Sequence, residues 1–232
     1  GSITSSVSVN TTAGFSIVSY TGTLANDTVG HGLGVAPKIV IVKNRTGVNT
    51  DWQVYHSSIG NTKSIQLNST SAPSTSSNFW NNTSPTSSVF SLGGATDNNG
   101  SGNNLIAYCF ADVKGFSKFG SYVGNGSTTD GTFVYLGFKP AFVMVKSSSN
   151  ASTQWVIKDN KRNTFNSCIA SLYPNLSAAE DSDSNIGIDF LSNGFKLYGN
   201  YSGINASGYT YIYMAFAENP FVGSDGTPVT AR

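Results

Sequence analysis

Short apolar runs alternate with polar, turn-forming segments along the whole chain, and they predict β-strands. The runs are rich in β-branched and aromatic residues, and glycine or proline lies just before several of them, which is typical of buried strands. The polar segments at 44–50 and 147–153 predict hairpin turns. Helical periodicity is weak, and only residues 175–180 could form one short helical turn. The strongest predicted strands are residues 38–43, 52–55, 105–111, 141–146, 155–158 and 209–216.

Several sequence motifs occur twice in the chain. The block Leu33–Lys43 resembles Leu136–Lys146, and Trp52 corresponds to Trp155 with the same separation of 103 positions. Near the end of each copy, residues 106–112 resemble residues 212–218. Ordered blocks at one nearly constant separation indicate an internal duplication.

We therefore predict an all-β fold of two tandem β-sandwich-like (jelly-roll-like) halves, packed rigidly with pseudo-two-fold symmetry. One barrel or jelly roll assembled from both halves is the alternative. Residues 112–114 are too short for a flexible linker, which favours rigid packing. The predicted divisions are an N-terminal extension at 1–13, a first repeat at 14–114, a second repeat at 115–221 and a C-terminal tail at 222–232.

Composition narrows the possible partners. Ser, Thr, Asn and Gly supply almost half of the 232 residues, yet the 28 aromatic residues are too many for a disordered chain. The formal net charge is only +1, which argues against nucleic acid and anionic lipid surfaces as partners. No apolar run approaches the roughly 18 residues of a membrane span, so we expect no membrane insertion.

The chain offers little for catalysis or metal binding. His31 and His56 are the only histidines, and the one acidic cluster, residues 180–183, is better explained as a solvated loop. Cys109 is expected to be a small buried apolar residue. A disulfide between Cys109 and Cys168 stays open. We expect no catalytic residues, no metal and no cofactor, and hence no enzyme.

Ligand recognition, most plainly of a sugar, is the function that remains. An exposed aromatic ring stacks on a sugar, and amides hydrogen-bond to its hydroxyls. The segment 68–88 is a predicted loop in which Trp80 would be the stacking platform, although Trp80 could instead anchor the loop to the core. Trp52 and Trp155 recur in both copies and are predicted to be core residues, so Trp52→Ala should cost about 3–5 kcal/mol. The predicted ligand-binding residues are Trp80, Asn78, Asn81, Asn82, Tyr173 and Tyr201.

The repeated phrases resemble a repeat region of tail-fibre and virion structural proteins from tailed bacteriophages of marine and environmental origin. The resemblance covers about residues 14–221, nearly the whole chain. It implies an appendage on the virion surface, often a homotrimeric fibre, that contacts other virion proteins and a host-surface glycan or protein. The phrases that carry it lie at residues 29–38, 52–56, 79–82, 107–110, 115–122 and 172–176.

Two functions compete from this point. The first is a receptor-binding module for a host glycan or surface protein. The second is a structural virion protein without a ligand, such as a capsid decoration or a fibre-shaft module. A depolymerase ranks third, because no convincing pair of acidic residues is available.

Overall fold

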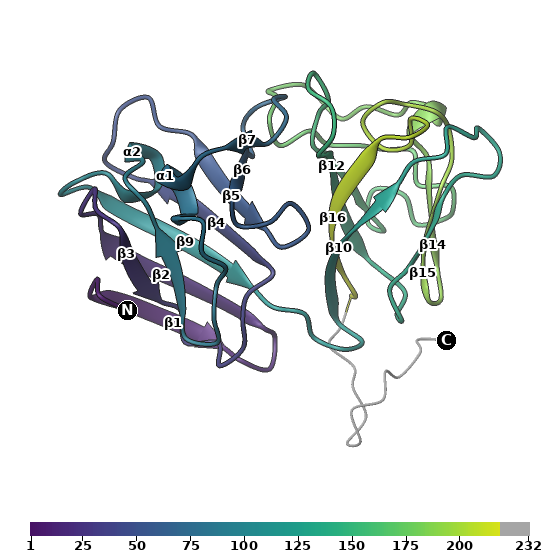
Figure 1. Cartoon of the computed structure of the whole chain (residues 1–232). Helices are drawn as coiled ribbons and strands as arrows, with labels where there is room; N and C mark the ends of the chain where they lie inside the picture. The colour runs from purple at the N-terminus through teal and green to yellow at the C-terminus, as the bar shows by residue number, and fades with distance from the viewer. Residues whose placement is uncertain (219–232) are drawn as a thin grey trace. The chain divides into compact units, whose positions relative to one another are not determined.

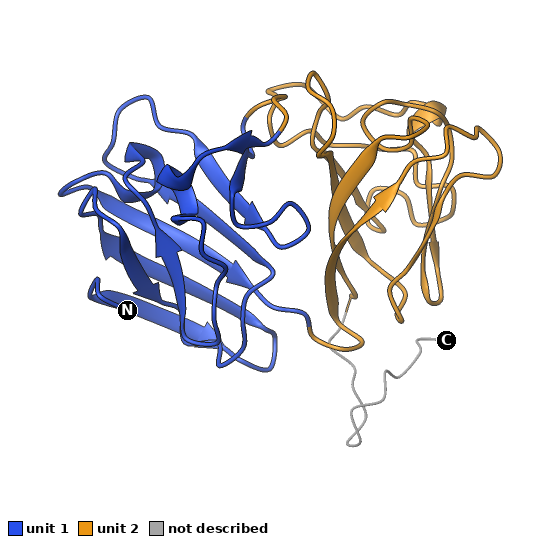
Figure 2. Cartoon of the chain, viewed as in Figure 1, with its two compact units in different colours: residues 1–68, 73–112 blue, residues 69–72, 113–232 orange. Residues whose placement is uncertain are grey.

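The computed structural model describes residues 1–218, which form two compact units (Figures 1 and 2). Unit 1 comprises residues 1–68 and 73–112, and unit 2 comprises residues 69–72 together with the chain from residue 113. The predicted boundary between the repeats is close to this division. The predicted tail at 222–232 and the last residues of the second repeat lie outside the described residues.

Unit 1 is built on a seven-stranded antiparallel sheet with the strand order β1-β2-β9-β4-β5-β6-β7 (Figure 1). Its strands are β1 (Ser5–Asn10), β2 (Phe15–Thr21), β4 (Ile39–Asn44), β5 (Trp52–His56), β6 (Lys63–Gln66), β7 (Ser74–Thr75) and β9 (Asn104–Phe110). The predicted N-terminal extension at 1–13 is therefore wrong, because residues 5–10 pair with β2 as an edge strand of this sheet.

A second, two-stranded sheet completes unit 1. It contains β3 (Asp27–Gly30) and β8 (Val89–Leu92), and two short helices, α1 (Ser77–Trp80) and α2 (Thr96–Asn99), flank β8 in the sequence. Val29 and Phe90 of this small sheet pack in one apolar cluster with Val18, Val40 and Leu105 of the large sheet. Alternate residues of the large sheet point into this cluster, so unit 1 has two layers with its core between them.

Unit 2 has the same kind of two-layer construction. A four-stranded sheet with the order β10-β16-β12-β13 shares one core with a three-stranded sheet with the order β11-β15-β14. A 3-10 helix, η1 (Ser184–Ile186), directly precedes β14 in the chain. The strands are β10 (Ser117–Val123), β11 (Phe133–Tyr135), β12 (Phe142–Ser147), β13 (Val156–Asp159), β14 (Ile188–Leu191), β15 (Gly194–Leu197) and β16 (Thr210–Phe216).

The all-β, sandwich-like prediction is confirmed. Every strand predicted from an apolar run is present, within one or two residues at each end. The predicted helical turn at 175–180 does not form. The alternative of a single barrel is also wrong, because the described residues form open sheets around two separate cores.

The large sheets of the two units share their strand order. In unit 1 the order β2-β9-β4-β5 corresponds to β10-β16-β12-β13 in unit 2. Val40 pairs with Cys109 on one side and Tyr55 on the other, whereas Val143 pairs with Ala215 and Lys158. Val40 and Val143 thus occupy matching positions, as the separation of 103 in the sequence requires.

Buried hydrogen bonds repeat as well. The Tyr20 hydroxyl donates to the Asn98 carbonyl at 2.7 Å, and the Tyr122 hydroxyl donates to the Ile204 carbonyl at 2.7 Å. These correspondences support the duplication proposed from the sequence. Rigid packing of the halves and pseudo-two-fold symmetry stay predictions.

The recurring tryptophans differ in their burial. Trp155 is buried, as predicted. Trp52 is only half-buried, and its ring stacks on Tyr108 with 6.4 Å between the ring centroids. The prediction that Trp52 is a core residue is therefore wrong, and the expected cost of Trp52→Ala falls to about 1–2 kcal/mol.

The two cysteines are free and buried in different units. Cys109 lies in the core of unit 1, and burial raises the pKa of its thiol to about 12. The prediction that Cys109 behaves as a small apolar residue is confirmed. No disulfide forms between Cys109 and Cys168.

Unit 2 contains two fully buried lysines. The Lys146 ammonium donates to the Thr153 hydroxyl at 2.8 Å, and the Lys158 ammonium donates to the Ile169 carbonyl at 2.7 Å. Burial lowers the pKa of each lysine from 10.5 to about 8, because a charged ammonium loses its hydration inside the protein.

We expect unit 2 to be more stable at pH 9 than at pH 7, by about 2 kcal/mol. Between pH 8 and 10.5 the unfolded chain keeps the protons of Lys146 and Lys158 while the folded protein releases them, so stability rises with pH. Burial raises the pKa values of Tyr122 and Tyr211, so the unfolded chain loses those protons first and stability falls above about pH 10. The raised pKa of Cys168 offsets part of the rise near pH 9.

Hydrogen exchange at a fixed denaturant concentration, corrected for the pH dependence of intrinsic exchange, measures this effect within unit 2. The double variant Lys146→Met, Lys158→Met should lose the rise between pH 7 and 9. A wild-type stability that is constant or falls over this interval would contradict the prediction.

Candidate functional site

The predicted binding loop is anchored by local backbone structure. The Ser76 hydroxyl accepts a hydrogen bond from the Asn78 amide at 3.2 Å and caps the one-turn helix α1. Asn81 and Asn82 end the helix in the left-handed conformation, with φ of 49° and 47°, which asparagine tolerates better than most residues. Asn78 and Asn82 are exposed and Asn81 is half-buried, so these amides can reach a ligand. The left-handed backbone of the turn is by itself a sufficient reason for asparagine at positions 81 and 82.

Trp80 is not a stacking platform. Its side chain is 2% exposed and lies in the core of unit 1, edge-to-face with Tyr55 at 5.9 Å between the ring centroids. The helix that carries it packs directly on Gly93, where a Cβ would lie 2.4 Å from the Ser77 carbonyl oxygen. The alternative that Trp80 anchors the loop to the core is therefore the correct one.

Tyr173 and Tyr201, by contrast, come together with acidic residues in unit 2. Both rings are half-exposed and pack on the rim of the unit 2 core. The Tyr173 hydroxyl donates to an Asp181 carboxylate oxygen at 2.7 Å. Burial, followed by the negative charges of Asp181 and Asp183, raises the pKa of Tyr201. We call Tyr173, Tyr201, Asp181 and Asp183 the tyrosine site.

The backbone fixes the parts of the tyrosine site. Ser171 and Asp181 exchange two backbone hydrogen bonds, at 2.7 and 3.1 Å, which holds the Asp181 carboxylate beside Tyr173. Tyr201 begins a tight turn in which its carbonyl accepts from the Ile204 and Asn205 amides. The positions of ring and carboxylate are therefore set before any ligand binds, which lowers the entropic cost of binding.

The histidines have structural roles. His31 is buried, its Nδ1 accepts from the Leu33 amide at 3.2 Å, and its Nε2 donates to the Thr86 carbonyl at 3.1 Å. Burial lowers the pKa of His31. His56 is also buried, and its Nδ1 accepts from the Ser58 amide. In residues 1–218 no three His, Cys, Asp or Glu side chains converge on a possible metal site.

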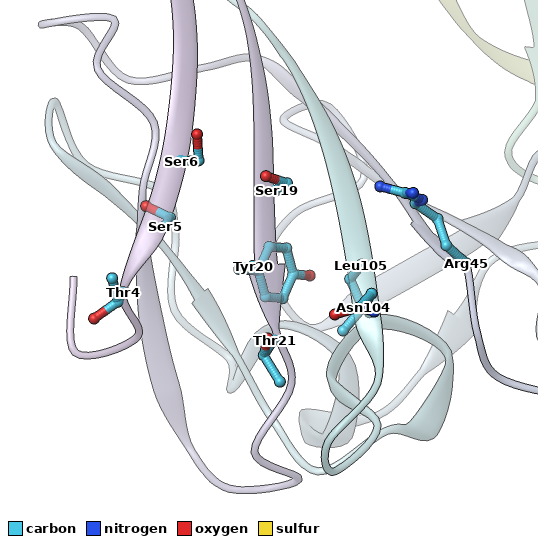
Figure 3. Close-up of a pocket in the computed structure, with 9 residues that line it drawn as sticks. All are labelled: Thr4, Ser5, Ser6, Ser19, Tyr20, Thr21, Arg45, Asn104 and Leu105. Atoms are coloured by element: carbon cyan, nitrogen blue, oxygen red, sulfur yellow. The ribbon is translucent and has the colours of Figure 1, made fainter.

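Unit 1 carries a pocket that the sequence did not suggest. Its volume is about 360 Å³, and Figure 3 shows its residues on β1, β2, β9 and the start of the loop after β4. Most of its side chains are hydroxyls or amides, and Arg45 is its one charged residue. We call it the Arg45 pocket. Its lining consists of Thr4, Ser5, Ser6, Ser19, Tyr20, Thr21, Arg45, Asn104 and Leu105.

Strand register explains why the Arg45 pocket is polar. Ser6 pairs with Ser19, and Thr21 pairs with Asn104, so their side chains share one face of the sheet. Tyr20 and Leu105 pair with each other, and their side chains enter the core on the opposite face. The Arg45 amide donates to the Asn104 carbonyl at 2.8 Å, which places Arg45 beside the same polar row.

The sequence matches the family described as Domain of unknown function (DUF7483) over residues 1–220. The chain belongs to the DUF7483 family. No curated protein and no solved structure matches it. The DUF7483 match extends through both units, so one such domain includes the tyrosine site and the Arg45 pocket.

The two units of the DUF7483 domain differ at the position of Arg45. In unit 2 the Ser148 amide donates to the Thr210 carbonyl at 2.8 Å, as the Arg45 amide does to Asn104 in unit 1. Serine therefore occupies the equivalent position in unit 2. The sheet of unit 2, within the described residues, also begins at β10 and lacks a counterpart of β1. The Arg45 pocket is specific to unit 1 of the domain.

No helix in the part of the chain that the structure describes is long and apolar enough to cross a membrane.

Proposed function

We propose that the protein is a host-recognition module of a virion appendage and that it binds a host-surface glycan at the tyrosine site. The observation that carries this proposal is the preorganised pair of half-exposed tyrosine rings beside the Asp181 carboxylate. An aromatic ring stacks on the apolar face of a sugar, while a carboxylate accepts hydrogen bonds from sugar hydroxyls.

The place of this module on a virion rests on the resemblance to bacteriophage tail-fibre and virion proteins. Homotrimeric assembly, the other virion proteins as neighbours and a position on the particle surface belong to the same proposal. Stacking and a few hydrogen bonds on an exposed rim give weak single-site binding, on the order of millimolar to micromolar. Several copies on one particle would raise the overall avidity.

Binding to an array of bacterial surface polysaccharides tests the function. We expect wild-type protein to bind at least one polysaccharide and Tyr201→Ala to weaken this binding about tenfold, because the variant lacks one stacking ring. Tyr135→Ala is the matched control, since Tyr135 is a 60% exposed tyrosine of the same unit outside the tyrosine site, and it should bind as wild type does.

Two outcomes would count against the proposal. Equal binding by Tyr201→Ala, with circular dichroism unchanged, would remove the tyrosine site as the binding site. Failure of wild-type protein to bind any polysaccharide would favour the second candidate, a structural virion protein without a glycan ligand.

A further inference from the structure

We propose that the Arg45 pocket is a second ligand-binding site, and that it takes the carboxylate-bearing sugar of an acidic polysaccharide. This site is separate from the tyrosine site, because the two lie in different units. The inference extends the proposed function by naming a ligand class, but its evidence is independent of the tyrosine site.

Arg45 is an exposed cation without an ion-pair partner among residues 1–218. The ion pairs among residues 1–218 use Lys161, Arg162 and Lys196, and none uses Arg45. The pocket contains no acidic side chain. A guanidinium with no carboxylate beside it attracts an anion, and its planar fork of N–H donors fits a carboxylate in two parallel hydrogen bonds.

A row of polar side chains without hydrogen-bond partners in residues 1–218 lies beside that charge. Ser6, Ser19, Thr21 and Asn104 point to the same face of the sheet as the pocket. Within the described residues, none of these four side chains makes a hydrogen bond, although Thr23 and Ser64 of the same unit do. Hydroxyls and amides that both donate and accept match the hydroxyls of a sugar ring.

The pocket is small, and its polar row stands on interior strands of the sheet. The pocket volume of about 360 Å³ is at the lower end of the range for small-ligand sites, roughly 300–1,000 Å³. β2 and β9 are interior strands of the seven-stranded sheet, so the polar row is held on a fixed backbone. The Tyr20 ring is buried and its hydroxyl donates to Asn98, which leaves no aromatic stacking surface in the pocket. Charge and hydrogen bonds must therefore provide the specificity.

Charge and hydroxyl recognition together define the ligand class. A neutral sugar would leave the charge of Arg45 without a counter-ion. A simple inorganic anion is too small to contact all four polar side chains at once, because they lie on three strands. A uronic acid unit within a polysaccharide offers a carboxylate to Arg45 and hydroxyls to the four polar side chains. Within residues 113–218, unit 2 has Ser148 at the position of Arg45 and no counterpart of β1, so these two features of the pocket are not shared by the described part of unit 2.

Titration of the full chain with glucuronic and galacturonic acid oligosaccharides, followed by amide chemical shifts in NMR, tests the proposal. Each oligosaccharide is paired with its carboxyl-reduced form. We expect the acidic forms to shift the amides of Ser6, Ser19 and Thr21, with affinity that falls as salt rises. The reduced forms should bind at least tenfold more weakly.

Variants distinguish the pocket from general charge attraction. Arg45→Ser, which copies the residue of unit 2, should weaken binding of the acidic oligosaccharides at least tenfold. Lys63→Ser is the matched control, because it removes one exposed positive charge from the same unit outside the pocket, and it should have no effect. Tyr201→Ala should also leave this binding unchanged, so failure of the tyrosine site and failure of the pocket are distinguishable.

The opposite results would overturn the proposal. In the first, wild-type protein binds no acidic oligosaccharide, and in the second, it binds the carboxyl-reduced forms equally well. In the third, Arg45→Ser and Lys63→Ser lose the same amount of binding. Displacement of the oligosaccharides by millimolar inorganic phosphate at constant ionic strength would also overturn it, because the pocket would then be a general anion site.

Discussion

Replacing Trp80 by alanine should lower the free energy of unfolding of unit 1 by about 3–5 kcal/mol, the usual cost of removing a buried tryptophan. Trp80 is among the largest fully buried side chains, and it fills the space between α1 and Tyr55. Gly93 packs against the α1 backbone, so the neighbouring chain cannot easily collapse into the space left by the ring.

Trp52→Ala is the matched control for this prediction. Trp52 is the same residue type in the same unit but is half-exposed, so its loss should cost about 1–2 kcal/mol. Hydrogen exchange at a series of urea concentrations measures both variants, and the loss of protection should be confined to peptides of unit 1. If Trp80→Ala destabilises unit 1 no more than Trp52→Ala does, the placement of Trp80 in the core is incorrect.

Trp80 and the two tyrosines were all predicted to bind a ligand, but the structure buries Trp80 and leaves Tyr173 and Tyr201 half-exposed. An aromatic residue among Ser and Asn is compatible both with an exposed platform and with an anchor. The deciding signals were Ser76 and the pair Asn81-Asn82, which form a capped helical turn with a left-handed end. Within this turn Ser77 and Asn78 are exposed, whereas Phe79 is half-buried and Trp80 is buried, so the turn presents its aromatic side to the core. Tyr173 and Tyr201 each begin a turn instead of lying inside one, because their carbonyls accept from later amides, and their rings are half-exposed.

The strand framework was predictable because its apolar runs are continuous. Residues 39–42 and 143–145 are buried on both faces of their strands, so burial and β-propensity favour the same structure. β1 was missed because its pattern is mostly polar. The alternation Ser6-Val7-Ser8-Val9 has the period of a strand with one polar face, and this signal could have identified it.

The Arg45 pocket could not be predicted from the sequence, because it depends on register. Ser6, Ser19 and Asn104 are far apart in the chain, and only the pairings of β1 with β2 and of β2 with β9 place them in one row. A shift of one residue in either pairing would move the hydroxyls to the core face. Single serines and threonines carry no signal in a sequence where they are so abundant.

Two buried asparagines occupy corresponding positions in the two units, as the proposed duplication requires. Asn99 and Asn205 are fully buried. Each of them connects two loops within its own unit, and these loops occupy equivalent positions in the two units. In unit 1 the Asn99 amide nitrogen donates to the carbonyls of Ala25 and Gly93, at 2.7 and 2.8 Å, and its oxygen accepts from the Thr23 amide at 2.9 Å.

Asn205 makes the corresponding bonds in unit 2. Its amide nitrogen donates to the Ser127 and Gly199 carbonyls, at 3.2 and 2.8 Å, and its oxygen accepts from the Asn125 amide at 3.1 Å. Both side chains therefore satisfy backbone groups of two separate segments.

Asn99→Ala and Asn205→Ala should each destabilise their own unit by about 2–4 kcal/mol. The first variant loses three side-chain hydrogen bonds and the second loses four, and both leave backbone groups unpaired. Hydrogen exchange should place the loss in unit 1 for Asn99→Ala and in unit 2 for Asn205→Ala. Asn26→Ala, at an exposed position, is the control and should cost less than about 0.5 kcal/mol. If the losses in the two units differ by more than about 2 kcal/mol, the two asparagines do not have equivalent roles, and the argument for duplication would lose its strongest side-chain evidence.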